Sequence, residues 1–167
     1  MDLLDYVSRG GFIVYILIGL NVIGFTIIIW KFFVLLIARK NKNKMVESII
    51  EFIKQNNEEF SSKSLDNVLR QKFTKLEYGL NTIKIISTIS PLLGLLGTVI
   101  GVLHSFDSIS KLGLGNPSVF SSGISIALIT TVAGMIVAIP HYIAYNYFVG
   151  VLDHAENDVE AEVLKKL

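Results

Sequence analysis

The sequence contains no cysteine and few charged residues. Of its 167 residues 17% are charged and 51% are hydrophobic, whereas about 25% of an average soluble domain is charged. Without cysteine the chain has no disulfide, no thiolate metal site and no cysteine nucleophile. A net charge of +1 also argues against nucleic-acid binding, which needs a basic surface. Too few polar residues remain to cover a soluble domain of this size, so the placement of the apolar residues decides the fold class.

Three stretches of more than 20 residues contain no Asp, Glu, Lys or Arg, namely residues 10–30, 85–106 and 112–152. Each is at least as long as the roughly 20 residues that a helix needs to cross a hydrocarbon core of ~30 Å. Gly, Asn, Pro and Ser residues at the start of the third stretch predict a loop, followed by one helix from about Gly123. We therefore predict an all-α membrane protein whose three spans cover about residues 12–37, 83–106 and 120–148.

The first span is expected to be retained rather than cleaved. The segment before it, residues 1–5, is acidic where a signal peptide is basic, and no small-residue cleavage site follows the run. Trp30, Phe32 and Phe33 are typical of an interfacial exit, and Lys31 beside them is expected to extend its ammonium group to water.

The distribution of basic residues predicts the orientation. Residues 38–82 hold nine of the fifteen Lys and Arg residues, whereas the first eleven residues and the turn 107–118 hold one each. Basic segments stay in the cytoplasm. We expect the N-terminus outside, and residues 38–82 and the C-terminal tail, 149–167, in the cytoplasm.

The cytoplasmic parts are expected to be helical. Apolar residues recur at helical spacing from Met45 to Ile53 and from Leu65 to Leu80. The second stripe runs into span two, which predicts one helix through the membrane boundary. The tail has five acids against two bases and residues 38–82 nine bases against six acids, so the two segments either contact each other or are separately solvated. With no repeat or linker, residues 1–167 are predicted to be a single domain.

The spans contain no Asp, Glu or Arg, so they cannot supply the acids and bases of an enzyme pocket. The histidines His104 and His141 lack the i, i+4 spacing of metal ligands and are interpreted as tolerated side chains rather than proton relays. The sequence therefore predicts no enzyme, no cofactor and no metal site.

Spans two and three each carry a face of small residues. When successive residues are placed 100° apart around the helix axis, the small residues of each helix fall within one arc. They are Gly94, Gly97, Thr98 and Gly101 in span two, and Gly123, Ala127, Thr130, Thr131, Gly134 and Ala138 in span three. Such faces let helices approach closely in lipid, or they line a lumen, and the sequence leaves both interpretations open. Pro91 and Pro140 are predicted helix kinks that free backbone carbonyls.

Two segments resemble the MotA/TolQ/ExbB proton channel family. Its second transmembrane helix is similar to LEYGL at residues 76–80 and to ISPLLGLLGTVIG at residues 89–101. Its third helix is similar to GISIALITTVAG at residues 123–134 and VAIP at residues 137–140. The likeness covers about residues 76–150 and is greatest to the ExbB branch of the family.

The resemblance implies a bacterial inner-membrane protein in which spans two and three, extended into the cytoplasm, line the pore of a ring-like homo-oligomer, a pentamer. It implies ExbD-like partner helices inside the pore, which supply an essential Asp, and TonB, which passes the energy of the proton motive force to outer-membrane transport. By residue match, Thr98 and Thr131 correspond to pore-facing threonines. The other candidate pore-lining residues are Gly94, Gly97, Gly101, Ala127, Thr130, Gly134 and Ala138.

Three features depart from family patterns. Ile126 stands where many members carry Glu, residues 38–82 are fewer than in the longer members, and stator subunits of the MotA type have four spans. A TolQ-like role in envelope integrity, with TolR and TolA as partners, is an alternative. A passive membrane scaffold without an ion path is a second alternative, favoured by the missing carboxylate.

Overall fold

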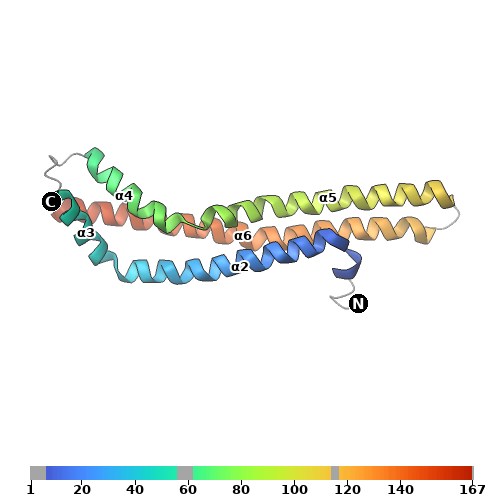
Figure 1. The fold of residues 1–167 in the computed structure, drawn as a ribbon, viewed down its shortest axis with the longest axis horizontal. Helices are drawn as coiled ribbons and strands as arrows, with labels where there is room; N and C mark the ends of the chain where they lie inside the picture. Colours follow the sequence, from blue (N-terminus) through green and yellow to red (C-terminus); the bar gives the residue numbers. More distant parts are fainter. Residues whose placement is uncertain (1–6, 56–61, 114–116, 167) are drawn as a thin grey trace. The chain divides into compact units, whose positions relative to one another are not determined.

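The computed structural model describes residues 7–55, 62–113 and 117–166, and these residues are almost entirely helical (Figure 1). Three of the helices are long and apolar enough to cross a membrane, namely α2, α5 and α6. This confirms the prediction of an all-helical chain with three helices of spanning length. The helices are α2 (Gly11–Lys40), α3 (Lys42–Gln55), α4 (Ser62–Glu77), α5 (Leu80–Leu112) and α6 (Pro117–Lys166).

The chain divides into two compact units. The first comprises residues 1–26 and 82–143, and the second comprises residues 27–81 and 144–167. In the first unit, apolar side chains of three helices form one cluster. Its buried members are Ile13 and Leu17 of α2, Ile86 of α5 and Val137 of α6.

The second unit buries the apolar stripes expected from residues 45–80. α3 and α4 pack against each other, and α6 contributes a third apolar face. The buried residues are Val46, Ile49 and Ile53 of α3, Leu65, Val68, Leu69 and Phe73 of α4, and Leu152, Val159 and Val163 of α6. Burial of these side chains, at about 1.5–3 kcal/mol each, is the main stabilising term of this unit.

The acidic tail contacts the basic segment, which settles the choice that the sequence left open. Lys42 of α3 lies 3.1 Å from the carboxylate of Glu162 and 3.8 Å from that of Asp158, both on α6. Because these side chains are partly exposed, the ion pairs add little to stability beside the apolar contacts.

The helix expected to continue from Leu65 into span two is broken. α4 ends at Glu77 and α5 begins at Leu80. Gly79 between them has a φ of 89°, in the left-handed region that ends helices and disfavours a side chain. The prediction of one continuous helix was wrong because periodicity does not register this glycine turn.

Lys31 of α2 stabilises the break. Its ammonium group donates to the carbonyl oxygen of Leu76, and to that of Tyr78 at 2.9 Å. Leu76 lies in the last turn of α4 and Tyr78 directly follows the helix, where carbonyl oxygens lack a donor within the helix. Lys31 is 0% exposed, so the expectation that it reaches water was wrong. The ammonium group instead donates hydrogen bonds inside the protein, where buried carbonyl oxygens without a donor would reduce the stability of the fold.

The start of the third helix also differs from the expectation. α6 begins at Pro117, although residues up to Ser122 were expected to form a loop. Proline is favoured at the first position of a helix, because its missing N–H has no helical partner there. The expected loop residues 114–116 lie outside the described residues. Pro91 and Pro140 lie inside α5 and α6, and the kinks at these prolines stay a prediction.

Replacing Lys31 tests the importance of this cap. Lys31→Met keeps the length of the side chain and leaves the carbonyls of Leu76 and Tyr78 without their donor, which we expect to cost about 1–3 kcal/mol of unfolding free energy. The exposed ion pair of Lys111 provides the control, Lys111→Met, with an expected loss of about 0–1 kcal/mol. Thermal unfolding in mild detergent measures both, and equal losses would contradict the role of Lys31.

Candidate functional site

α5 and α6 approach each other backbone to backbone in the first unit. A Cβ atom at Gly101 would lie 2.6 Å from the carbonyl oxygen of Gly123, and one at Gly134 would lie 2.6 Å from that of Ser90. A Cβ atom at Gly94 would lie 2.9 Å from the carbonyl oxygen of Thr130. Backbone cannot yield at such distances, so only glycine fits. The small faces of the two helices therefore pack against each other within one chain.

The structure divides the nine candidate pore-lining residues into two groups. Thr98 and Thr131 are half-buried. The other seven are buried within the chain, namely Gly94, Gly97, Gly101, Ala127, Thr130, Gly134 and Ala138. A Cβ atom at Gly97 would overlap the side chain of Thr130. In a single chain, the accessible hydroxyls of this face are those of Thr98 and Thr131.

These two hydroxyl groups form one polar pair across the helix contact. The Oγ1 atoms of Thr98 and Thr131 lie 2.5 Å apart, and either can donate. The Oγ1 of Thr98 lies 3.2 Å from the carbonyl oxygen of Gly94 and 3.3 Å from that of Ala127. The Oγ1 of Thr131 lies 3.4 Å from the Gly94 carbonyl oxygen. Whichever hydroxyl donates to its neighbour, the other can donate to a carbonyl, so the pair has two alternative hydrogen-bond directions.

Thr130 differs from its neighbour Thr131. It is 1% exposed, and its hydroxyl donates to the carbonyl oxygen of Ala127 at 2.9 Å within its own helix. The hydroxyl also lies 3.1 Å from the carbonyl oxygen of Ile126. Backbone bonding of this kind is usual for threonine in membrane helices. Thr130 therefore acts as a packing residue in this chain.

Two serines belong to the same contact, and the sequence analysis did not identify them. Ser105 is buried, and its Oγ lies 3.1 Å from the carbonyl oxygen of Gly101 and 3.1 Å from that of Phe120. Buried Ser90 donates to Ile86 at 2.7 Å. Both serines continue the three- and four-residue spacing of the glycines on α5, and that spacing was the signal available in the sequence.

His141 is fully buried against α2. Its Nδ1 lies 2.7 Å from the carbonyl oxygen of Val137, which can only accept, so Nδ1 carries the hydrogen. Its ring meets Phe25 edge to face at 5.2 Å, and a Cβ atom at Gly24 would overlap it. Among the described residues Nε2 has no hydrogen-bond partner. The arrangement is that of an imidazole ring packed between two helices.

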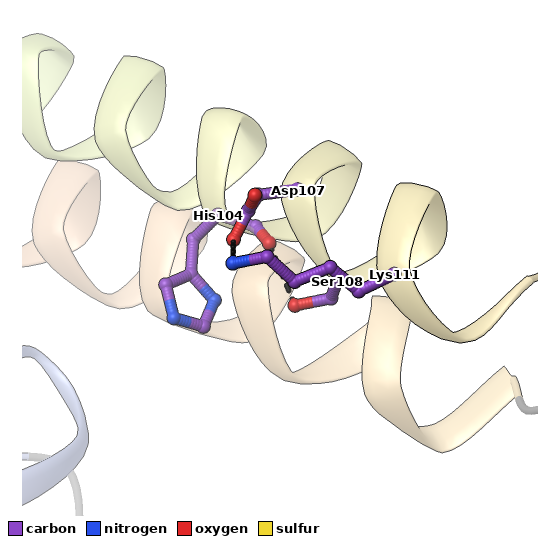
Figure 2. A network of polar contacts seen from close by, with 4 residues as sticks. All are labelled: His104, Asp107, Ser108 and Lys111. Atoms are coloured by element: carbon purple, nitrogen blue, oxygen red, sulfur yellow. Dashed lines mark hydrogen bonds and ion pairs between the residues drawn. The ribbon is translucent and has the colours of Figure 1, made fainter.

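His104 lies near the C-terminal end of α5, beside a small polar network (Figure 2). Its carbonyl oxygen accepts from Ser108 at 2.8 Å, and Lys111 pairs with Asp107 at 2.7 Å. All four side chains are partly or fully exposed. Exposed ion pairs one helical turn apart contribute little to stability. The geometry of this network does not indicate a functional site.

The second unit contains a cluster of carboxylates around a cavity of about 360 Å³. Glu156 and Glu77 line it with Arg70. Glu156 belongs to the tail, beyond the predicted third span. Burial first, and then the negative charges of Glu77, Asp153 and Glu160, raise the pKa of Glu156, while Arg70 opposes the rise. Across the described residues no group of His, Asp and Glu has the arrangement of a metal site.

The sequence matches known proteins in the region that contains this site. The profile of the MotA/TolQ/ExbB proton channel family matches residues 36–161. The chain is 34% identical over 105 residues to a putative biopolymer transport protein ExbB homolog of Methanothermobacter thermautotrophicus, covering 62% of this chain and 36% of that protein.

Two bacterial proteins named biopolymer transport protein ExbB are also similar. The protein of Salmonella typhimurium is 40% identical over 82 residues, which are 47% of this chain and 34% of the relative. The protein of Aquifex aeolicus is 39% identical over 92 residues, which are 55% of this chain and 58% of the relative. The chain thus covers less than two thirds of the length of these relatives.

A bulky residue at the backbone contact should separate α5 from α6. We expect Gly101→Val to lower the unfolding free energy by about 1–3 kcal/mol, because the new side chain meets the backbone of α6. Gly19→Val is the matched control, since a Cβ atom at Gly19 meets nothing within 4 Å. Unfolding in mild detergent compares them, and equal stability of the two variants would refute the contact.

The carboxylate cluster predicts a pH dependence of stability. Because the pKa of Glu156 is raised in the folded chain, the folded state binds more protons than the unfolded state just above the ordinary Glu pKa of about 4.3. Stability therefore falls as the pH rises through that window. We expect Glu156→Gln to raise the unfolding temperature at pH 7 and to have little effect at pH 4. Exposed Glu47 of α3 gives the control variant, Glu47→Gln, which should change neither value.

Proposed function

Because the chain belongs to the MotA/TolQ/ExbB proton channel family, we propose that it is an inner-membrane proton-channel subunit working with an ExbD-like partner and TonB. The assembly uses the proton motive force to energise TonB-dependent transport across the outer membrane. Proteins named biopolymer transport protein ExbB among its relatives support this role. The family is one of channel subunits rather than enzymes, and the spans predicted from the sequence, residues 12–37, 83–106 and 120–148, contain no Asp, Glu or Arg.

The observation that carries the proposal is the half-buried hydroxyl pair of Thr98 and Thr131. A hydroxyl group does not store a proton near neutral pH, but it both donates and accepts hydrogen bonds. When a partner's carboxyl group is protonated, the pair accepts its hydrogen. When the carboxyl group is ionised, one hydroxyl turns from the Gly94 carbonyl, 3.2–3.4 Å away, and donates to the carboxylate. The pair can therefore form a hydrogen bond with both the protonated and the ionised form of an Asp on an ExbD-like helix.

The exposed apolar surface supports assembly into a ring. Only 22% of the most apolar window of α2, and 33% of those of α5 and α6, is buried within the chain. The remainder must meet lipid or other subunits. We propose a pentameric ring in which the buried small residues hold α5 against α6 while Thr98 and Thr131 face the pore. Residues 1–167 act as one domain, with the N-terminus in the periplasm and residues 38–82 and 149–167 extending the ring into the cytoplasm.

Removing the hydroxyl groups tests the proposal. Thr98→Val and Thr131→Val keep the side-chain shape, so the oligomer should assemble, while proton flux falls about tenfold and furthest in the double variant. A hydrogen bond to a charged group, about 1.5–3 kcal/mol, is the basis of that magnitude. Flux is measured in liposomes that contain the chain and its ExbD-like partner.

The matched control is Thr88→Val on the same helix, because exposed Thr88 bonds its own backbone, the carbonyl of Lys84, at 2.9 Å. It should leave the flux unchanged. Normal flux in both single variants would refute the hydroxyl pair as part of the path. Absence of flux from the unmodified assembly would instead favour the passive scaffold.

A further inference from the structure

The second unit contains an apolar groove that the proposed channel function does not use. The groove has a volume of about 540 Å³ and lies between the end of α2, the start of α3, and α4 and α6. Buried Phe73 and Leu152 line it together with Phe32 and Leu36, which are each 49% exposed. Its volume is within the range of about 300–1,000 Å³ of ligand sites. The groove can therefore take up the apolar part of a ligand.

One end of the groove carries a positive charge that is not neutralised. Arg39 and Lys42 both line this end. Lys42 pairs with Glu162 and Asp158 of α6. Arg39 is exposed and, among the residues that the structure describes, forms no ion pair. Asp158 also lines the groove, but its carboxylate is paired with Lys42, so a ligand with a negative group would meet the guanidinium of Arg39 with no carboxylate paired to it among the described residues.

The position of the groove along α2 indicates where such a ligand comes from. Its wall from Phe32 to Arg39 coincides with the end of the apolar stretch of α2, whose last turn is basic. Exposed Trp30, Phe32 and Phe33 on that helix are typical of a membrane–water interface. An occupant would therefore keep its apolar part at hydrocarbon depth and its polar part at the level of Arg39.

We propose that this groove binds one anionic phospholipid, with an acyl chain along Phe32 and Leu36 and the phosphate group at Arg39. The guanidinium fork matches two phosphate oxygens, which a single ammonium group does not. A net negative headgroup adds the attraction that basic residues near a membrane surface have for anionic lipid, about fivefold in affinity for each such residue. A zwitterionic lipid lacks that net attraction.

The experiment measures lipid retained by the intact assembly. The chain, purified in neutral detergent, receives phosphatidylglycerol or phosphatidylcholine, and native mass spectrometry counts bound lipid. We expect preferential retention of phosphatidylglycerol, about fivefold weaker in Arg39→Gln. Arg9→Gln, which removes an exposed arginine outside the groove, is the matched control and should bind normally. Ala155→Trp fills the groove from α6 and should displace the lipid, because Ala155 lines it.

Each other outcome overturns the proposal in an identifiable way. Equal retention of the two lipids, or equal binding by Arg39→Gln and Arg9→Gln, excludes recognition by Arg39. Displacement by inorganic phosphate alone identifies a simple anion site. If Ala155→Trp leaves bound lipid unchanged but reduces the mass of the oligomer, a second copy of the chain occupies the groove. The threonine variants should bind lipid normally even where they lose flux, and this expected result distinguishes a failure of the lipid site from a failure of the proposed channel.

Discussion

The contact between the backbones of α5 and α6 determines the geometry of the candidate site. Helices in lipid gain no hydrophobic energy from association, so they depend on close van der Waals packing. Glycine at positions 94, 101, 123 and 134 removes the side chains that would keep the two backbones apart. The hydroxyl groups of Thr98 and Thr131 meet at 2.5 Å only because their helices approach so closely. A wider separation would leave two isolated threonines, each bonded to its own helix.

Satisfaction of buried polar groups is the second constraint, and it explains the hydrogen bonds of several buried polar side chains. Lys31 supplies hydrogens to carbonyls exposed by the helix break at Gly79. Thr130 and Ser90 bond within their own helices, and His141 donates to Val137. In a medium of low dielectric these bonds avoid the cost of unpaired polar groups. The pair of Thr98 and Thr131 differs from these residues because it is half-buried and its hydroxyl groups meet across two helices.

The two units have different chemistry. The first unit has an apolar cluster, a glycine contact and a hydroxyl pair, and the predicted spans 12–37, 83–106 and 120–148 contain no carboxylate. The second unit contains the amphipathic helices, the ion pairs of Lys42, the carboxylate cluster at Glu156 and the groove at Arg39. In the proposed channel, the titratable group in the membrane therefore comes from the ExbD-like partner helix.

Hydrophobic periodicity and charge by themselves determined the helical class, the three helices of spanning length, the apolar stripes of α3 and α4, and the small faces of α5 and α6. These features are local, because each depends on residues within a few turns of one helix. The glycine turn before Leu80 and the start of α6 at Pro117 escaped this reasoning, since a single cap residue overrides periodicity. Only the tertiary structure decided that Lys31 is buried, that Thr130 packs inward, and that Thr98 and Thr131 share a hydrogen bond. Each depends on which residue of a distant segment lies opposite, and no pattern along one helix contains that information.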